Sequence, residues 1–241
     1  MRKISAGFAT FSLALLLLAA FAVPVAAQTS PQKIPGQKSM LLIQDTFKLV
    51  PGTWALYDVL DKQKNEPFLM SISVLGKETY KGKDGVWLEI DVQMKDMPRV
   101  VTDALVEEAA GPTGEVLKAV VQVEGVSPFK VPEKYLKGAD QEVGQFEPAK
   151  IVRKLEQKKI DHKGKTVDVL VVEAENSQGE KVTAAVSLQI LPIALYAAET
   201  DDLKMTVNDW GTGATTKLKG EPVSFTLWLI EMVGKELGKI K

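Results

Sequence analysis

The chain has 241 residues, with 30 Lys and Arg against 31 Asp and Glu, a single histidine and no cysteine. The near-neutral charge offers no basic surface for a nucleic acid, and the absence of cysteine excludes disulfides, thiolate nucleophiles and cysteine-bound metals. One histidine without cysteine cannot supply the usual ligands of a zinc site. We therefore expect no metal and no cofactor, and a fold that depends on its hydrophobic core.

The first 27 residues have the layout of a secretory signal peptide. Arg2 and Lys3 precede an apolar run at 11–23, and small residues follow as far as Ala27. This run is too short to cross about 30 Å of hydrocarbon, and a small-residue site is typical of signal-peptide cleavage. We expect cleavage after Ala27 and a soluble periplasmic or secreted chain without a transmembrane segment. Its net charge is −3, because 28 Lys and Arg remain against 31 acids.

The segments after the signal peptide are expected to form a polar leader at 28–38 and one β-rich domain at 39–241. At the start of this domain Leu42, Ile43, Phe47 and Val50 fall close to helical spacing, after Ser39 and before a Pro-Gly pair at 51–52. Serine is a common helix cap, and Pro-Gly ends helices. The pattern predicts a short helix here.

From Thr53 onward, apolar residues alternate with polar ones, which is the pattern of strands with one dry face. In the segment VWLEIDVQM the alternation places Glu89 and Asp91 on the face opposite Leu88 and Ile90. Turn-forming clusters separate the segments, so the pattern favours an antiparallel sheet over repeated strand–helix–strand units. The predicted strands lie in 54–60, 67–76, 86–94, 99–108, 116–125, 166–175, 181–190 and 203–210.

Two other regions leave alternatives open. The segment 125–147, rich in Pro and Gly, predicts a long loop with a helical turn around 133–136, which is either a ligand-contacting loop or a surface excursion without a role. At the C-terminus Ser224 can cap a helix whose stripe comprises Ile230, Val233, Leu237 and Ile240. This helix either packs on the sheet or is an amphipathic segment that seeks a surface.

Few side chains suggest catalysis. His162 lies beside Asp161 in a charged turn and is interpreted as a solvated residue, and the chain contains no G-x-S-x-G elbow. Two carboxyl groups about 5 to 10 Å apart would suffice for glycoside cleavage. The candidate pairs are interpreted as solvated charges at turns, at strand ends or on the polar face of a strand. These pairs are Glu107 with Glu108, Asp201 with Asp202, and Glu89 with Asp91.

The segment NDWGTGATTKLKG, at 208–220, holds two glycines followed by hydroxyl residues and a lysine. A third glycine, a Gly-Lys step and a following helix are all missing, which argues against a phosphate-binding loop. We expect a tight connection between strands, with Gly211 or Gly213 at positive φ. Strict alternation places Trp210 at the sheet rim, on the face opposite Met205 and Val207, where a lid or ligand edge is expected.

Three motifs carry a resemblance to a known type of protein. They are W-x-x-Y at Trp54 and Tyr57, GKETYKGKDGVWLEIDV at 76–92, and DWGTGATTKL at 209–218. With the signal peptide and strand layout, the chain resembles β-rich secreted bacterial proteins similar to the periplasmic lipoprotein-localisation carriers of the LolA/LolB kind. The resemblance implies a curved antiparallel sheet, an incomplete barrel covered by helices, that holds acyl chains on its concave apolar face. None of the motifs is a ligand-contact signature, so no functional residue carries over.

The predicted fold is therefore α+β and mainly β, an incomplete barrel of about eight to ten strands with a short N-terminal and a C-terminal helix covering it. The first functional hypothesis is a non-enzymatic envelope carrier for a lipid-like or lipoprotein ligand. The second is a protein–protein interaction module with a filled core, and the third is a carboxylate-dependent hydrolase. The residues expected to line a lipid groove are Met70, Ile72, Leu88, Ile90, Val92, Met94, Leu117 and Val121, with Trp210 at the rim.

Overall fold

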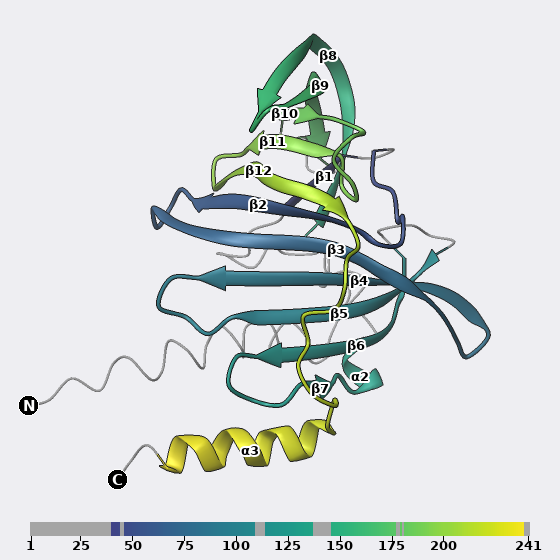
Figure 1. Ribbon diagram of the computed structural model, residues 1–241, viewed down its shortest axis with the longest axis vertical. Coiled ribbons are helices and arrows are strands. Elements are labelled where there is room, and N and C mark those ends of the chain that lie inside the picture. The colour runs from purple at the N-terminus through teal and green to yellow at the C-terminus, as the bar shows by residue number, and fades with distance from the viewer. Residues whose placement is uncertain are drawn as a thin grey trace, which may run out of the picture.

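The computed structural model describes residues 40–43, 46–108, 114–136, 146–176, 179 and 181–238. The predicted signal peptide at 1–27 and leader at 28–38 lie outside the described residues. Within them, one curved sheet dominates the fold, and two helices accompany it (Figure 1). The elements are β1 (Met40–Ile43), β2 (Thr53–Asp61), β3 (Glu66–Tyr80), β4 (Lys83–Met94), β5 (Val100–Glu107), β6 (Val116–Val123), β7 (Phe129–Lys130), α2 (Glu133–Leu136), β8 (Phe146–His162), β9 (Lys165–Asn176), β10 (Lys181–Val186), β11 (Leu195–Glu199), β12 (Leu203–Thr212) and α3 (Phe225–Gly238).

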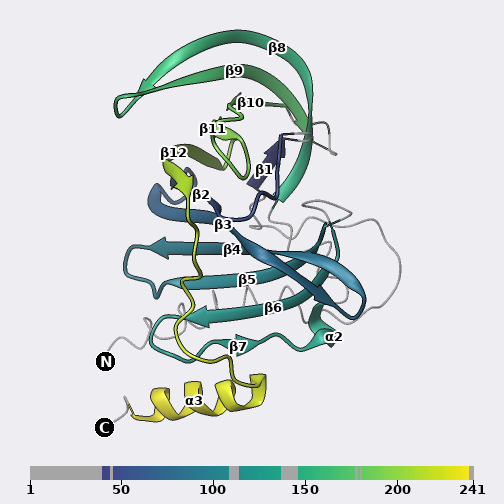
Figure 2. The same ribbon diagram turned by 45° about the vertical axis from the view of Figure 1, so that its right-hand side comes forward.

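The described strands form a single twelve-stranded sheet in the order β1-β8-β9-β10-β11-β12-β2-β3-β4-β5-β6-β7. Every neighbouring pair is antiparallel except β1 with β8. The sheet does not close into a barrel, and Figure 2 shows β8 and β9 arching over the upper end. The predicted fold class, a mainly β incomplete barrel with a C-terminal helix, is confirmed.

All eight predicted strands are present, as β2 to β6, β9, β10 and β12. The most extended strand that the sequence did not reveal is β8, which pairs with β9 through two register shifts, between Ile151 and Arg153 and between Lys154 and Glu156. Each shift reverses the side-chain alternation, so that a two-residue period does not persist along this charged strand.

The helix predicted at 39–50 is wrong. Residues Met40 to Ile43 instead form β1, which pairs with β8 in parallel register, Met40 opposite Phe146 and Ile43 opposite Ala149. Four apolar residues in a short window fit a helix and a buried strand equally well, and a helix of this length has little stability of its own. The pairing with β8, which lies more than a hundred residues away, therefore decides the structure.

Both remaining helix predictions are confirmed. The turn at Glu133–Leu136 is α2. Ser224 caps α3, since its Oγ accepts the Leu227 N–H at 3.3 Å and its carbonyl accepts the Trp228 N–H at 3.0 Å. The C-terminal helix was expected to cover the sheet, but α3 lies alongside β7 at the edge of the sheet (Figures 1 and 2).

The sheet has two chemically different faces. Register pairs Tyr57 of β2 with Met70, and Met70 with Val92 of β4, on what we call the inner face. Inner-face residues of β2–β6 and of β9–β11 belong to one core cluster, so this face is the concave side of the curved sheet. Tyr57 is buried and its hydroxyl donates to the Leu195 carbonyl of β11 at 3.2 Å, which ties the two halves together. The opposite, convex side is called the outer face.

Candidate functional site

Eight of the nine residues expected to meet a ligand lie on the inner face, and seven of them, all but Trp210, come from β3, β4 and β6. Cross-strand partners share a face, and the register joins Met70 with Val92, Ile72 with Ile90, and Ile90 through Thr102 with Val121. Three of the seven are buried, and four remain partly exposed. The buried residues are Met70, Ile72 and Leu88, and the partly exposed ones are Ile90, Val92, Met94 and Val121.

Leu117 does not join this set. It is the extra residue of a bulge, because Lys118 pairs with Leu105 while Val116 pairs with Val106. The Leu117 and Leu105 side chains both lie over Gly85, where an added Cβ would stand 3.2 Å and 2.8 Å from them. Leu105 is an outer-face residue, so Leu117 is on the outer face as well. The bulge interrupts the alternation on which its predicted position depended.

Trp210 is also on the other face from the one predicted. The register of β12 shifts between Val207 and Asp209, so that Val207 pairs with Tyr57 and Trp210 pairs with Ala55. Tyr57 and Ala55 both face inward, which places Trp210 on the same face as Val207. One extra residue in β12 is enough to reverse the assignment made from strict alternation.

His162 is not the solvated turn residue that the sequence suggested. It ends β8, is half-buried, and its ring lies 5.3 Å from the Trp210 ring and 5.8 Å from the Tyr196 ring, centroid to centroid. Its Nε2 is 2.9 Å from the Asn208 carbonyl oxygen, a contact made by Lys163 as well. These interactions attach the turn between β8 and β9 to β12.

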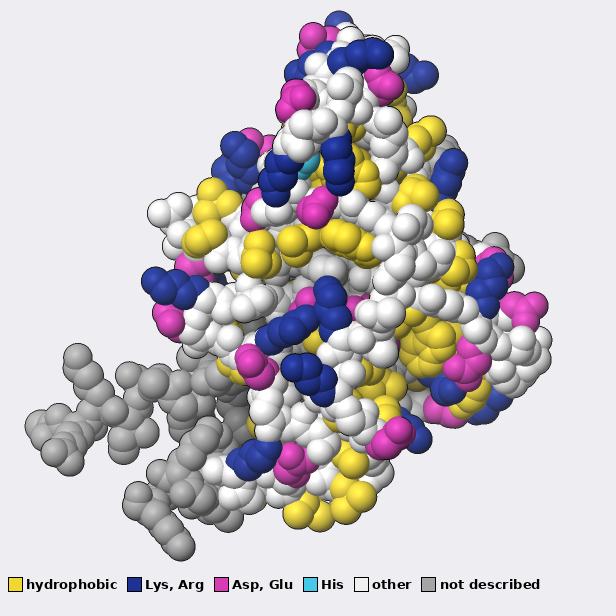
Figure 3. All heavy atoms as spheres, viewed as in Figure 1, with side chains coloured by type: hydrophobic (Ala, Val, Ile, Leu, Met, Phe, Trp, Pro, Cys, Tyr) yellow, Lys and Arg dark blue, Asp and Glu magenta, His cyan; other side chains and the backbone are white. Residues whose placement is uncertain are grey.

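A depression of about 530 Å³ opens at the rim of the sheet, where β2 and β4 end and β3 and β12 begin. It is lined by Asp58, Val59, Leu60, Pro67, Phe68, Leu69, Gln93, Met94, Lys95, Lys204 and Thr206. Most of the lining residues, such as Leu60, Leu69 and Thr206, alternate with inner-face residues of their strands, so the depression lies mainly on the outer face. In Figure 3 a band of hydrophobic side chains crosses the outer face over β2 and β3.

The outer face of β3 to β6 is crossed by a segment that we call the strap, residues 213–224, between β12 and α3 (Figures 1 and 2). The strap is attached along its whole length. Ala214 N–H donates to the Gly52 carbonyl at 2.9 Å, Lys219 N–H to Gln122 Oε1 at 2.8 Å, and Val223 N–H to the Pro128 carbonyl at 2.8 Å. The expected tight connection between two strands is thus wrong, because the chain leaves the sheet edge and crosses its face.

The two glycines have separate roles at the start of the strap. Gly213 has φ +82°, as predicted for one of the pair, and turns the chain away from β12. Gly211 is still in β12, and an added Cβ would lie 3.1 to 3.2 Å from the Trp54 indole. Trp54 Nε1 donates to the Thr212 carbonyl at 3.1 Å, so the indole lies beside the point where the strap begins.

Under the strap lies a pair of carboxyl groups that the sequence did not reveal as a site. Glu89 of β4 and Asp103 of β5 are directly opposite each other and are only 0% and 6% exposed. Thr216 Oγ1 is 3.0 Å from Glu89 Oε2 and 3.0 Å from Asp103 Oδ2, and Lys217 N–H donates to Glu89 Oε2 at 2.6 Å. The interpretation of Glu89 and Asp91 as solvated charges is therefore wrong, although their predicted face is correct.

The geometry at Thr216 requires a proton on one of the two carboxyl groups. A hydroxyl donates a single hydrogen, and Thr216 Oγ1 also accepts the Leu218 N–H at 3.1 Å. Since Glu89 already accepts the Lys217 N–H, the proton is best placed on Asp103. Consistent with this, burial and the nearby Glu89 charge raise the pKa of Asp103 to about 7.

Asp91 completes the cluster as an ionised group. Arg99 donates to both of its oxygens, at 2.6 and 2.8 Å, and Lys217 Nζ donates to Asp91 Oδ2 at 2.9 Å and to Ser71 Oγ at 2.8 Å. Burial acts to raise the pKa of Asp91, but the hydrogen bonds from Arg99 and Lys217 outweigh it and lower the pKa. With Asp103 protonated, two carboxylates face two cations and the cluster is neutral. Figure 3 shows Lys and Arg side chains gathered across this part of the outer face.

The chemistry of this cluster is that of an attachment site. A hydrolytic carboxyl pair has to leave room for substrate and water between its acids, whereas here the Thr216 hydroxyl contacts both. One oxygen of each acid, Glu89 Oε1 and Asp103 Oδ1, is buried without a hydrogen-bond partner.

A sequence signal for the cluster exists, but it becomes readable only with the register. Ser71, Glu89 and Asp103 occupy the polar positions of three consecutive predicted strands, and 213–220 lacks the two-residue period of its surroundings. Polar side chains aligned on adjacent strands need a cover with hydrogen-bonding groups if they are buried. The Thr-Lys pair at 216–217 is such a cover.

Comparisons with known proteins indicate a distant likeness of fold. No family model matches the chain, and no curated protein matches it. The crystal structure of MucB aligns with 9% identity and a TM-score of 0.31. The alignment covers 70% of this chain and 57% of the MucB chain. A candidate lipoprotein of Parabacteroides distasonis aligns with 9% identity and a TM-score of 0.29, over 69% of this chain and 98% of the other. At these scores the likeness identifies no ligand, partner or site. In the described part of the chain, no helix is long and apolar enough to span a bilayer.

Proposed function

We propose that this chain is an exported, non-enzymatic binding or carrier protein that holds a lipid-like ligand, or the acyl chain of a lipoprotein, on the inner face of its sheet. The observation that carries the proposal is a row of partly exposed aliphatic side chains on the inner face of β4. Ile90, Val92 and Met94 form this row.

The chemistry of the row fits an acyl chain. Successive inner-face positions of a strand lie about 7 Å apart, so the three side chains present a continuous apolar track. Each methylene that leaves water for such a track gains about 0.8 kcal/mol.

The position of the helices supports the same proposal. Among the described elements α2 contacts β6 and α3 contacts β7, so that both lie toward one edge of the sheet. An apolar sheet face has to be covered by something, and a ligand is one of the few possibilities. The buried acids, by contrast, are engaged by the strap, which removes the strongest argument for a hydrolase.

A binding assay with a matched pair of variants tests the proposal. Val121 and Val120 are adjacent valines of similar partial exposure on β6, and Val121 faces inward while Val120 faces outward, opposite Asp103. We expect Val121→Gln to weaken binding of cis-parinaric acid, a fluorescent fatty acid, by about tenfold, because a polar amide replaces an aliphatic contact. Val120→Gln should bind as the unmodified protein does.

Ile90→Gln serves as the second inner-face variant, since Ile90 is joined to Val121 through Thr102 in the same register row. Circular dichroism of each variant shows whether the sheet is intact. Equal binding by the inner-face and outer-face variants, or no binding of fatty acid by the unmodified protein, would contradict the proposal.

A further inference from the structure

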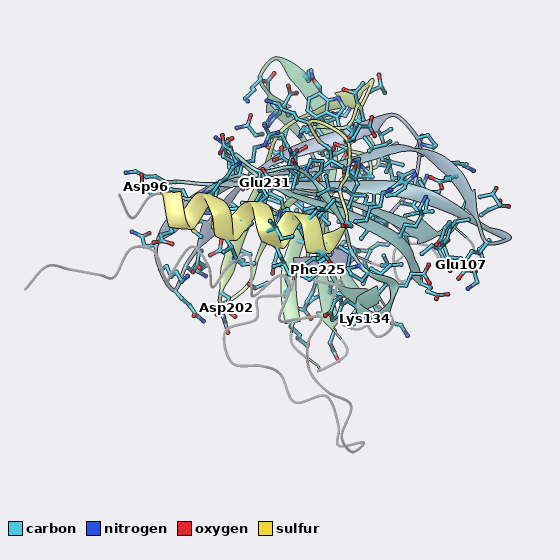
Figure 4. The ribbon with its side chains drawn as sticks, turned by 90° about the horizontal axis from the view of Figure 1, so that it is seen from below. Asp96, Glu107, Lys134, Asp202, Phe225 and Glu231 are labelled. Carbon is cyan, nitrogen blue, oxygen red and sulfur yellow. The ribbon has the colours of Figure 1, made fainter. Side chains whose placement is uncertain are left out.

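The helix α3 has one side attached to the body of the protein. Trp228 is 3% exposed, its ring centroid lies 4.3 Å from that of Phe129 in β7, and the Phe225 ring lies 5.5 Å from Phe129. On the same side Glu231 accepts the Ser127 N–H and pairs with Lys235 at 3.0 Å, and Lys235 also donates to the Gly125 carbonyl. Figure 4 shows Phe225 at one end of α3 and Glu231 near its middle.

The other side, which we call the outward face of α3, carries no charged residue over the described residues 226–234. At a rotation of about 100° per residue, it lies opposite Trp228 and Met232. The six exposed residues at 226–234 are four aliphatic residues, one threonine and one glycine. They are Thr226, Leu227, Leu229, Ile230, Val233 and Gly234. The four aliphatic side chains are 41% to 64% exposed, and hydrophobic side chains are visible at the lower end of the molecule in Figure 3.

This arrangement differs from the usual one, because both sides of the helix carry apolar residues. A surface helix normally turns its apolar stripe to the core and charged residues to water. In α3 the charged pair Glu231 and Lys235 lies against the body. Ile230 and Val233, from the stripe that was expected either to pack on the sheet or to seek another surface, face outward. Apolar patches rimmed by polar groups on an otherwise charged protein mark places where another surface is met.

We propose that the outward face of α3 docks on the surface of a lipid bilayer. The helix lies across one end of the molecule, with no described element beyond it, so a flat surface can reach its whole length (Figures 1 and 2). An interfacial helix buries its apolar side at the boundary between head groups and acyl chains, which requires only the one face.

A second copy of the chain is the competing occupant, and the size of the face argues against it. A stable protein interface takes about 20 to 30 residues from each partner. The outward face offers six residues, four of them aliphatic, which is far below that number but enough for a reversible contact with lipid. Because the face is uncharged, the docking should not depend on anionic lipid.

Vesicle sedimentation tests this inference with a closely matched control. Ile230 and Leu188 are aliphatic residues of nearly equal exposure, 64% and 61%, but Leu188 lies in the turn after β10, away from α3. The exported protein, as the cell processes it, is mixed with vesicles of phosphatidylcholine alone or with added phosphatidylglycerol. We expect binding to both vesicle types, a decrease of about tenfold in the partition coefficient for Ile230→Lys, and no change for Leu188→Lys.

Val233→Lys is the second outward-face variant, with the same expected loss, and near-native circular dichroism is required of all three. The inference is overturned if the unmodified protein binds neither vesicle type, or if Leu188→Lys loses as much binding as Ile230→Lys. A concentration-dependent dimer without vesicles that Ile230→Lys abolishes also overturns it, since a second copy would then cover the face. The test is independent of whether the inner face holds a ligand.

Discussion

On β4, Glu89 and Asp91 face outward while Leu88 and Ile90 face inward, and the two sets of side chains are covered in different ways. The outer face is crossed by the strap, which supplies a directed hydrogen bond to each buried acid. The inner face presents aliphatic side chains, some of them partly exposed, with neither described helix above them. Buried polar groups need partners at defined positions, whereas apolar groups accept any apolar neighbour. The difference teaches that directed hydrogen bonds of the chain itself cover the outer face, whereas the described residues leave part of the inner face exposed.

The largest expected effect comes from removing Asp91. Its loss leaves the Arg99 guanidinium and the Lys217 ammonium without their shared carboxylate, so Asp91→Ala should lower the free energy of unfolding by about 2–4 kcal/mol in urea denaturation. Asp168→Ala is the control, because Asp168 is exposed and lies 3.7 Å from Lys159. Equal stability of the two variants would show that the strap is loosely held and would break the comparison.

The second prediction concerns pH. The pKa of Asp103 is raised from 3.8 to about 7, so the folded protein binds more protons than the unfolded chain between these values. The contribution of Asp103 to stability is therefore complete below about pH 4 and is lost as pH rises through 7, a change of about 2–3 kcal/mol after allowance for partial exposure. Urea denaturation from pH 4.5 to 8 measures it.

Asp103→Asn is the matched variant, because asparagine keeps the shape and cannot titrate. The difference in stability between this variant and the unmodified protein should change with pH in that window. The charged groups around Asp103 are Glu89 beside it, and Asp91, Arg99 and Lys217 farther along the cluster. A difference that stays constant from pH 4.5 to 8 would show that the pair shares no proton.

The third prediction tests how closely the outer face is packed. At Gly85 an added Cβ would stand 2.8 Å from Leu105, while at Gly76 there is open space. Gly85→Ala should therefore lower stability by about 1–2 kcal/mol, measured by thermal or urea unfolding, and Gly76→Ala should stay within about 0.5 kcal/mol of the unmodified protein. If neither variant lowers stability, the outer face is not closely packed at Gly85, and the contrast between the two faces fails.

The sequence predicts the face of a residue correctly where apolar and polar residues alternate regularly along its strand. Along β4 the alternation is unbroken, and the faces of Glu89 and Ile90 are predicted correctly. At Leu117 and Trp210 a single extra residue shifts the register, and both side chains are on the face opposite the one predicted. Bulges are set by the pairing of two strands, which a single strand's pattern does not contain.

The burial of the acids was missed for a related reason. Glu89 and Asp91 are followed more than a hundred residues later by Thr216 and Lys217, and their contact depends on where β12 ends in space. The glycine pair drew attention to this segment, but through the wrong chemistry, since Gly213 starts the strap and Gly211 accommodates Trp54. Long-range cover of a polar face becomes visible only with the fold.

The smallest expected effect is that of the strap hydroxyl. Thr216→Val keeps the shape of the side chain but removes the group between Glu89 and Asp103, so it should lower the free energy of unfolding by about 1 kcal/mol. Thr215→Val is the neighbouring control, exposed on the strap, and should be neutral. A loss at both positions would indicate that the effect does not depend on the contact of the Thr216 hydroxyl with Glu89 and Asp103.

The central claim is that the inner face holds a lipid-like ligand, and native mass spectrometry tests it most directly. The protein is purified from the envelope of its own cells without detergent and sprayed under non-denaturing conditions, and the bound material is identified after denaturation. The account predicts a species heavier than the processed chain that releases an acyl-containing molecule, with its occupancy reduced in Val121→Gln and retained in Val120→Gln. A spectrum containing only the ligand-free mass would contradict it.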